Sequence, residues 1–175
     1  DKLQCWGQNA NGQLGDGSLV DRMQPVQAVS LPKITSIARG FTHNLAIAED
    51  GHVWAWGANT YGQLGSGKTA LIAGAGQSLA VANVKQVSAG QTHSLAVDSA
   101  GRVWAWGGNL SGQIGNGSNS NQSTPVQLST PTNAVAVAAA SLSSVALTKD
   151  GNVWTWGDNK MGELGDGSTQ NANVP

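Results

Sequence analysis

The chain has 175 residues, of which 24 are Gly and 7 are Trp, against one Phe, one Tyr and one Cys. So much Gly excludes a mostly helical domain, because each Gly inside a helix costs about 1 kcal/mol relative to Ala. Nine Lys and Arg against ten Asp and Glu give a formal charge of -1, which supplies no basic field, so we expect no nucleic-acid partner. No apolar run approaches the roughly 18 residues of a membrane span, and a single Cys cannot form an internal disulfide.

The Trp residues repeat with a period of 50 along the chain. The same motif surrounds them each time, reading CWGQNANGQLGDG from Cys5, VWAWGANTYGQLGSG from Val53, VWAWGGNLSGQIGNG from Val103 and VWTWGDNKMGELGDG from Val153. Most Gly residues also fall at repeated positions. The residues that we expect to build the repeat are Trp6, Trp54, Trp56, Trp104, Trp106, Trp154, Trp156, Gly12, Gly62, Gly112 and Gly162.

Each period predicts four short strands. In the third period they are Val84 to Ser88, Ser94 to Val97, Val103 to Trp106 and Pro125 to Leu128, the last after a loop rich in Gly, Asn and Ser. Turns are predicted at Asp50-Gly51, Ala100-Gly101 and Asp150-Gly151, because Gly readily takes the positive φ that tight hairpin turns need. Four strands in 50 residues form one blade of a β-propeller.

The composition of the strands predicts how such blades pack. A four-stranded sheet cannot cover its own apolar face, so we expect the Trp and Val residues of VWxW to fill the space between neighbouring blades. Small residues, such as Ala89 with Gly90 and Ala138 to Ala140, suit the crowded end nearest the central axis.

These motifs, VWxWGxNxxGQLGxG together with xGxxHSLAV at a fixed spacing, resemble the regulator-of-chromosome-condensation repeat family. The resemblance covers essentially the whole chain and implies an all-β propeller with about 3.5 four-stranded blades in 175 residues. One repeat array over 1–175 is expected, divided approximately into a half repeat 1–25 and repeats 26–75, 76–125 and 126–175. About 3.5 blades cannot close a ring, so we expect the open blade edges to be covered by missing chain or another subunit. Since Asp1 is not Met, we also expect a processed or excised piece.

The family spans unrelated functions, including an exchange factor for a small GTPase, a plant UV-B receptor and a secreted bacterial inhibitor of β-lactamases. The exchange factor is expected to carry a protruding insertion, and this chain has none. The UV-B receptor uses Trp and Arg in a GWRHT loop. The matching positions here begin at Gly40, Gly90 and Ser141 and carry neither residue, which argues against photoreception.

Several apparent chemical motifs have structural explanations. Gly62 to Thr69 satisfies GxxxxGK[ST], but its glycines belong to the repeat, so nucleotide binding is not expected. His43 and His93 occupy equivalent positions on successive blades and should radiate apart, each bonding a neighbouring turn rather than a metal. Asp16 and Asp166 supply one carboxylate per loop, too few for calcium. We find no catalytic constellation and predict a non-enzymatic protein without cofactor or metal.

Three glycosylation sequons begin at Asn109, Asn116 and Asn121. Together with the low charge, they favour an extracellular or cell-surface setting, with an intracellular one as the alternative.

Positions that vary between repeats are free of the fold requirement and are candidates for recognition. Four of them are apolar at positions expected to be exposed, although neutral drift explains such residues equally well. The stretch from Ala70 to Val81 is a second candidate, because it lacks the Pro-Val pair of the other repeats. The candidate partner-binding residues are Arg39, Phe41, Tyr61, Gln91, Leu110, Leu142, Lys160 and Met161.

Two functions follow as hypotheses. The first is a non-enzymatic protein-interaction scaffold or self-assembly module, bound to a protein partner or to further copies of itself; one form of this hypothesis is a structural component of a secreted or cell-surface assembly. The alternative is a fragment of a guanine-nucleotide exchange regulator of a small GTPase.

Overall fold

A computed structural model describes residues 2–77 and 81–175 of the chain. These residues form thirteen β-strands and no helix, so the expected all-β class is confirmed. None of the described segments is therefore an apolar helix of membrane-spanning length.

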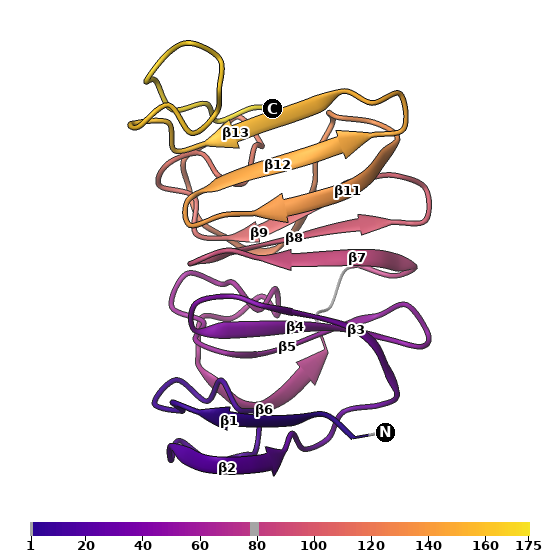
Figure 1. The fold of residues 1–175 in the computed structure, drawn as a ribbon, viewed down its shortest axis with the longest axis vertical. Coiled ribbons are helices and arrows are strands. Elements are labelled where there is room, and N and C mark those ends of the chain that lie inside the picture. The colour runs from indigo at the N-terminus through magenta and orange to yellow at the C-terminus, as the bar shows by residue number, and fades with distance from the viewer. Residues whose placement is uncertain (1, 78–80) are drawn as a thin grey trace.

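The strands form four antiparallel sheets, each of which follows the chain as a simple meander. The first sheet has only two strands, and the last has three. They consist of β1 (Gln4–Gly7) and β2 (Arg22–Gln27); β3 (Ile34–Arg39), β4 (His43–Ala48), β5 (Val53–Gly57) and β6 (Ile72–Gln77); β7 (Val84–Ala89), β8 (His93–Asp98), β9 (Val103–Gly107) and β10 (Gln122–Gln127); and β11 (Ala134–Ala139), β12 (Ser143–Thr148) and β13 (Val153–Gly157). The sheets succeed one another in chain order from the bottom to the top of Figure 1.

The strands expected in the third period are confirmed, the first three to within one residue at each end. The fourth strand, β10, begins at Gln122, ahead of the expected start at Pro125. Its register against β9 shifts between Gln122 and Val126, so Pro125, which has no backbone N–H, lies in an irregular part of an edge strand. The predicted hairpin turns also form, and Gly51 in the first of them has a φ of 78°.

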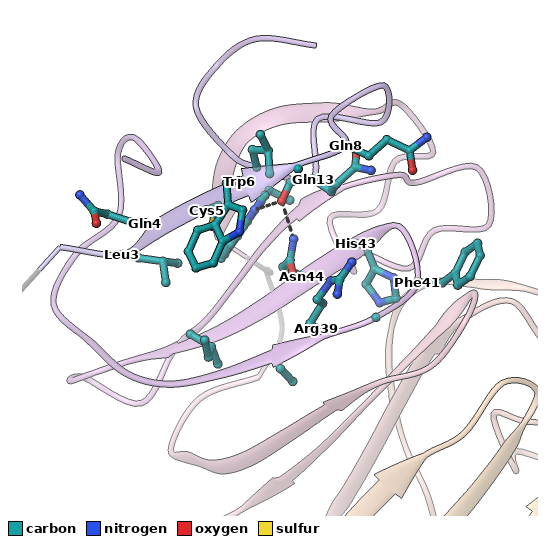
Figure 2. A pocket seen from close by; sticks show the side chains of 16 residues that line it. Leu3, Gln4, Cys5, Trp6, Gln8, Gln13, Arg39, Phe41, His43 and Asn44 are labelled. Atoms are coloured by element: carbon teal, nitrogen blue, oxygen red, sulfur yellow. Dashed lines mark hydrogen bonds between the residues drawn. The ribbon is translucent and has the colours of Figure 1, made fainter. Parts of the chain in front are cut away.

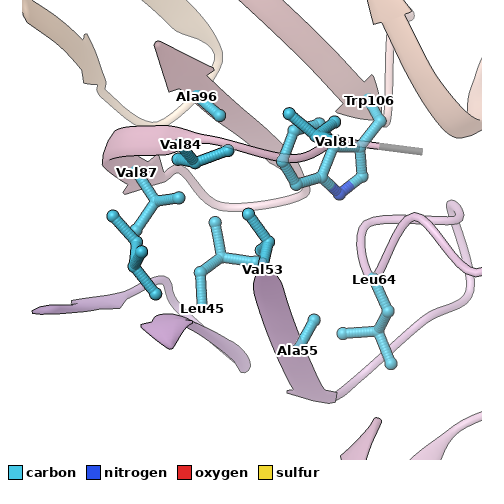
Figure 3. Close-up of a cluster of buried hydrophobic side chains, with 10 residues drawn as sticks. Leu45, Val53, Ala55, Leu64, Val81, Val84, Val87, Ala96 and Trp106 are labelled. Atoms are coloured by element: carbon cyan, nitrogen blue, oxygen red, sulfur yellow. The ribbon is translucent and has the colours of Figure 1, made fainter. Parts of the chain in front are cut away.

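The core lies between the sheets rather than within them. One cluster joins Leu45 and Val53 of one sheet to Val84, Val87 and Trp106 of the next (Figure 3). The corresponding cluster one blade further contains Val103 and Trp156, among others. As expected, VWxW residues therefore fill the space between blades.

The two Trp positions of VWxW differ in burial. Trp56, Trp106 and Trp156 are at most 1% exposed, whereas Trp54, Trp104 and Trp154 are half-buried. Burying one indole ring fully contributes up to about 5 kcal/mol from its apolar area. Trp6 is 63% exposed, because no blade lies against its outer side.

The first strands of neighbouring blades contact one another, β3 with β7 and β7 with β11. Crowding explains the small residues here, since a Cβ added at Gly90 would lie 2.5 Å from the carbonyl oxygen of Ala140. The Gln86 side chain accepts a bond of 2.9 Å from Val137 N and donates one of 3.2 Å to Val137 O. This side chain therefore ties β7 to the edge of β11.

The chain forms an open arc of blades. In the first sheet β1 pairs with β2 alone, whereas β5 and β9 each lie between two strands. At the other end, an isolated bridge joins Gly157 to Ala172. Val153 is 64% exposed, while the equivalent Val53 and Val103 are fully buried. Both ends of the arc thus present surface that a neighbouring blade covers elsewhere.

Candidate partner-binding face

The candidate partner-binding residues lie mostly in loops at one end of the sheets. Because each sheet is an antiparallel meander, loops that follow alternate strands gather on the same side. The long loops 58–71, 108–121 and 158–171 lie on the left in Figure 1. The short turns 40–42, 90–92 and 140–142 connect the first two strands of each blade at the same end. Arg39 is the exception, since it is the last residue of β3.

Four of these residues line one groove of about 250 Å³. Tyr61 and Leu110 come from two successive long loops, and Gln91 and Leu142 come from two successive short turns. Leu110 is 74% exposed and Tyr61 is 37% exposed, so both apolar side chains are open to solvent. Three consecutive blades thus contribute to a single apolar depression.

The other four candidates lie elsewhere. Arg39 and Phe41 line a second groove of about 380 Å³ between β1 and the β3–β4 pair (Figure 2). Lys160 and Met161 are exposed in the loop after β13 and line neither groove. The eight residues therefore do not converge on one point. Of the stretch from Ala70 to Val81, residues 72–77 form β6, while residues 78–80 lie outside the described residues.

In each long loop, the side chain of one buried Asn makes hydrogen bonds that hold the loop backbone in place. The sequence motifs alone did not identify these residues as organising the loops. Asn59 Nδ2 donates to the carbonyl oxygens of Lys68 and Ala70, and Asn59 Oδ1 accepts from Leu64 N. Asn9, Asn109 and Asn159 bond their own loops in the same way, and all four side chains are at most 1% exposed. The repeated GxNxxGQLG spacing was the signal that could have identified them.

The first Gly of the GQLG-type turn faces the next blade in three of the four repeats. A Cβ at Gly62 would lie 2.5 Å from Ser123 Cα in β10, and one at Gly12 would lie 2.6 Å from Ala73 Cα in β6. A Cβ at Gly112 would lie 2.7 Å from Asn173 Cα, whereas a Cβ at Gly162 would have nothing within 4 Å. These turns therefore pack one blade onto the next, so the face is held by contacts between blades.

The two histidines belong to a chain of hydrogen bonds between blades. Nε2 of His43 lies 3.0 Å from Ser94 Oγ, which in turn donates to Gln63 O at 2.7 Å. Since the serine gives its proton to this carbonyl, His43 Nε2 must carry the proton it donates. His93, Ser144 and Gln113 repeat the arrangement one blade further. Each histidine therefore bonds a serine on a strand of the next blade, not a turn as expected, and the serine makes the bond to the turn.

Burial keeps both imidazole rings neutral. It lowers the pKa of His43 to about 4 and that of His93 to about 3, the latter with a smaller contribution from the charge of His43. The two residues occupy separate blades, and no three His, Cys, Asp or Glu side chains in residues 2–77 and 81–175 gather as a metal site requires. Their role in this structure is to join blades.

The other apparent motifs also serve the loops. Residues 62–71 carry no helix, and β6 begins at Ile72, so the phosphate-loop pattern lacks the helix that such a site needs. Although burial works to raise it, hydrogen bonds from Ser18, Arg22 and Asn9 lower the Asp16 pKa to about 2. Asn109 is fully buried and its Nδ2 donates to Ser118 O, so this sequon is not a glycan acceptor in the folded chain.

Comparison with family models decides the classification. The model of the regulator of chromosome condensation (RCC1) repeat matches residues 2–47, 50–97 and 100–147, and a second RCC1 repeat model matches residues 34–63, 84–113 and 134–163. The chain belongs to the RCC1 repeat family. The resemblance inferred from the Trp and Gly spacing is therefore confirmed.

Solved RCC1 propellers match the fold over nearly the whole chain. Yeast RCC1 (Prp20) bound to Kap60 has a TM-score of 0.88 and 24% identity, covering 99% of this chain and 44% of the other. Prp20p from Saccharomyces cerevisiae, studied for its binding to Gsp1p and histones, matches equally well over 45% of its length. Human WBSCR16 has a TM-score of 0.82 and 25% identity, covering 98% of this chain and 46% of the other.

Among curated proteins, the ultraviolet-B receptor UVR8 of Arabidopsis thaliana is 40% identical over 55 residues, which cover 30% of this chain and 12% of the receptor. The chain thus spans less than half the length of the RCC1 propellers that it matches and a small part of the receptor.

Proposed function

We propose that this RCC1 repeat segment binds a protein partner through the groove of Tyr61, Gln91, Leu110 and Leu142. The main support for this proposal is that these four residues vary between repeats, yet line one apolar depression. The loops behind them are fixed by buried Asn side chains and by contacts between blades, so the surface is already formed before a partner arrives. Preformed apolar depressions with a few polar groups are suited to receiving an anchoring side chain.

The partner class that we favour is a small GTPase, as in the exchange-regulator alternative drawn from the sequence. Support comes from the similarity to yeast Prp20p, which was studied for binding to Gsp1p and histones. The same similarity favours the intracellular alternative over an extracellular setting. The secreted and self-assembling parts of the first hypothesis gain no support from the relatives.

Surface plasmon resonance with purified Gsp1p tests this function. We expect Leu110→Asp to weaken binding by about tenfold or more, because it places a charge in the apolar depression. Val135→Asp is the matched control, since Val135 is 52% exposed on β11 and does not line the groove. Nucleotide release from Gsp1p, measured with the same proteins, separates a regulator from a simple binder. Absence of binding, or equal losses in both variants, would contradict the proposal.

A further inference from the structure

The long loop 58–71 lacks a hydrogen-bond acceptor that the other three long loops share. In loops 8–21, 108–121 and 158–171, an Asp or Asn oxygen accepts from the backbone N–H two residues further along. These bonds are Ser18 N to Asp16 Oδ1 at 2.9 Å, Ser118 N to Asn116 Oδ1 at 3.1 Å and Ser168 N to Asp166 Oδ1 at 2.8 Å. The corresponding residue in loop 58–71 is Ser66, whose buried Oγ has no hydrogen-bond partner in the described part of the chain. Lys68 N likewise finds no acceptor among residues 2–77 and 81–175.

Two more acceptors are missing from the same loop. In the other three loops, a serine Oγ accepts from the backbone N–H two residues later, as in Val20 N to Ser18 Oγ at 3.3 Å, Ser120 N to Ser118 Oγ at 3.3 Å and Gln170 N to Ser168 Oγ at 3.2 Å. An Asp or Asn oxygen also accepts from the backbone N–H of the buried Asn, as in Asn9 N to Asp21 Oδ1 at 2.7 Å, Asn109 N to Asn121 Oδ1 at 3.0 Å and Asn159 N to Asn171 Oδ1 at 2.9 Å. In loop 58–71, Lys68 stands in place of the serine and Leu71 in place of the Asp or Asn. No described residue accepts from Ala70 N or Asn59 N.

The backbone of loop 58–71 nevertheless keeps the shape of its counterparts. Asn59 Nδ2 donates to Lys68 O and Ala70 O, both at 2.9 Å. The same two bonds in loop 108–121 measure 2.9 and 3.1 Å. The φ angles of Gly65 and Gly67 are 71° and 75°, against 82° and 78° one blade further. The unpaired N–H groups therefore arise from the side chains that this loop carries and not from a different loop conformation.

The substitutions also change the charge of the loop. In loop 8–21 the Asp16 side chain is 6% exposed and accepts from Arg22 as well as from Ser18. Loop 58–71 contains no Asp or Glu, and it carries Lys68, which forms no ion pair within the described residues. A group of unpaired backbone N–H donors beside a cation favours an anion. Loop 58–71 thus has the donors that hold a carboxylate elsewhere in the chain, without the carboxylate itself.

We propose that loop 58–71 is a binding site for a carboxylate group from outside this chain. The carboxylate takes the place that Asp16 fills in its own loop. One of its oxygens accepts from Lys68 N and Ser66 Oγ, the other accepts from Ala70 N, and the Lys68 ammonium supplies the opposite charge. This site needs no helix, unlike a nucleotide phosphate site, and it is independent of the function proposed above.

Titration with sodium formate, followed through the NMR shifts of backbone amide protons, tests the site. Because a hydrogen bond to a carboxylate moves an amide proton downfield, the Lys68 and Ala70 amide protons should move downfield and saturate as formate is added. The matching amides of the other loops already have acceptors and should stay in place; they are those of Ser18, Ser118 and Ser168. Sodium chloride at the same concentrations controls for ionic strength and should move none of them.

One substitution supplies the carboxylate from within the chain. In Ser66→Asp the Lys68 amide proton should lie downfield before formate is added, and formate should no longer move it. Ser120→Asp adds the same charge to loop 108–121 at an exposed residue and should leave the formate response unchanged.

Two lysine variants test the contribution of the charge. Lys68→Met should weaken formate binding about two- to fivefold, because an exposed ion pair contributes little more than this. Lys160→Met removes an exposed lysine from loop 158–171 and should leave the Kd for formate unchanged. The amide spectrum of each variant also shows whether it is folded.

Two further probes identify the kind of ligand. The α-amide of N-acetylglutamate presents the same carboxylate on a side chain, so binding at least as tight as that of formate indicates an acidic side chain of a partner protein. Binding of formate alone indicates a free small acid. Three results would overturn the proposal: inorganic phosphate binds while formate does not, formate and chloride act alike, or Ser66→Asp responds to formate as the unsubstituted chain does. Binding to Gsp1p is a separate measurement, so failure here leaves the proposed function untouched.

Discussion

Single residues in this chain act mainly by joining blades. The His43–Ser94–Gln63 chain of hydrogen bonds begins and ends in one blade and passes through the next, and Trp106 Nε1 donates to the same Gln63 carbonyl at 2.8 Å. The repeated spacing indicated that the histidines were structural. It did not reveal the serine, because residues 51 apart in sequence become neighbours only when blades stack.

Because His43 and His93 are buried, we expect the free energy of unfolding to fall on mild acidification. Their folded pKa values, about 4 and about 3, lie below the ordinary 6.5, so the unfolded chain binds more protons between these values. Stability is therefore complete above about pH 6.5 and falls as the pH drops toward 4. From about pH 6.5 to pH 5, we expect a loss on the order of 2 kcal/mol for each histidine.

Urea unfolding at about pH 7 and about pH 5 measures this loss. His93→Ser should remove about half of the pH dependence, since Ser143 shows that the repeat accepts serine at this position. Gln91→Ser, at an exposed residue without an ionisable group, is the control and should keep the wild-type slope. An unchanged slope in His93→Ser would contradict the assignment.

At the scale of elements, the same loop makes different contacts depending on its place in the arc. The GQLG turns after β1 and β5 contact the last strand of the following blade, and the turn after β9 contacts Asn173, at the position of such a strand. The turn after β13 has no neighbouring blade, and a Cβ at its Gly162 would have nothing within 4 Å. The sequence motif is almost identical in all four. Position in the stack, rather than local sequence, therefore decides what each turn contributes to stability.

Substitution of two equivalent glycines tests this difference. Gly62 and Gly162 have φ of +81° and +82°, so Ala should impose a similar backbone strain of about 1 to 2 kcal/mol at both. Only at Gly62 would the new Cβ also collide with Ser123 Cα, so Gly62→Ala should cost about 2 kcal/mol more than Gly162→Ala. Equal changes in the free energy of unfolding would show that the close approach is not needed.

For the whole molecule, the arc has a well-covered middle and two exposed ends. Every residue of β8 is buried, whereas β1 and β2 contain no buried residue. In repeat proteins each unit is stabilised by its neighbours, so a unit with one neighbour is less stable than a unit with two. The hydrogen bonds between the Gln86 side chain and the Val137 backbone further stabilise the contact between β7 and β11.

This arrangement predicts a gradient of hydrogen exchange. Amide protons of β7, β8 and β9 should exchange slowest, and those of β1, β2 and β13 fastest, because local opening is easiest where few contacts must break. Mass spectrometry of peptic fragments resolves these segments. Uniform exchange along the chain would indicate that the blades unfold as one unit instead.

The sequence alone determined the class of fold, the strands within a repeat and the family, because a 50-residue period in Trp and Gly records contacts that every blade makes. It also placed variable residues at exposed positions. Only the tertiary structure decided that Tyr61, Gln91, Leu110 and Leu142 share one groove while Met161 stands apart, and that Ile37 is open where Val87 is covered. The physical reason is that a repeat motif describes one blade, whereas grooves, exposed edges and inter-blade bonds arise between blades and depend on which neighbours are present.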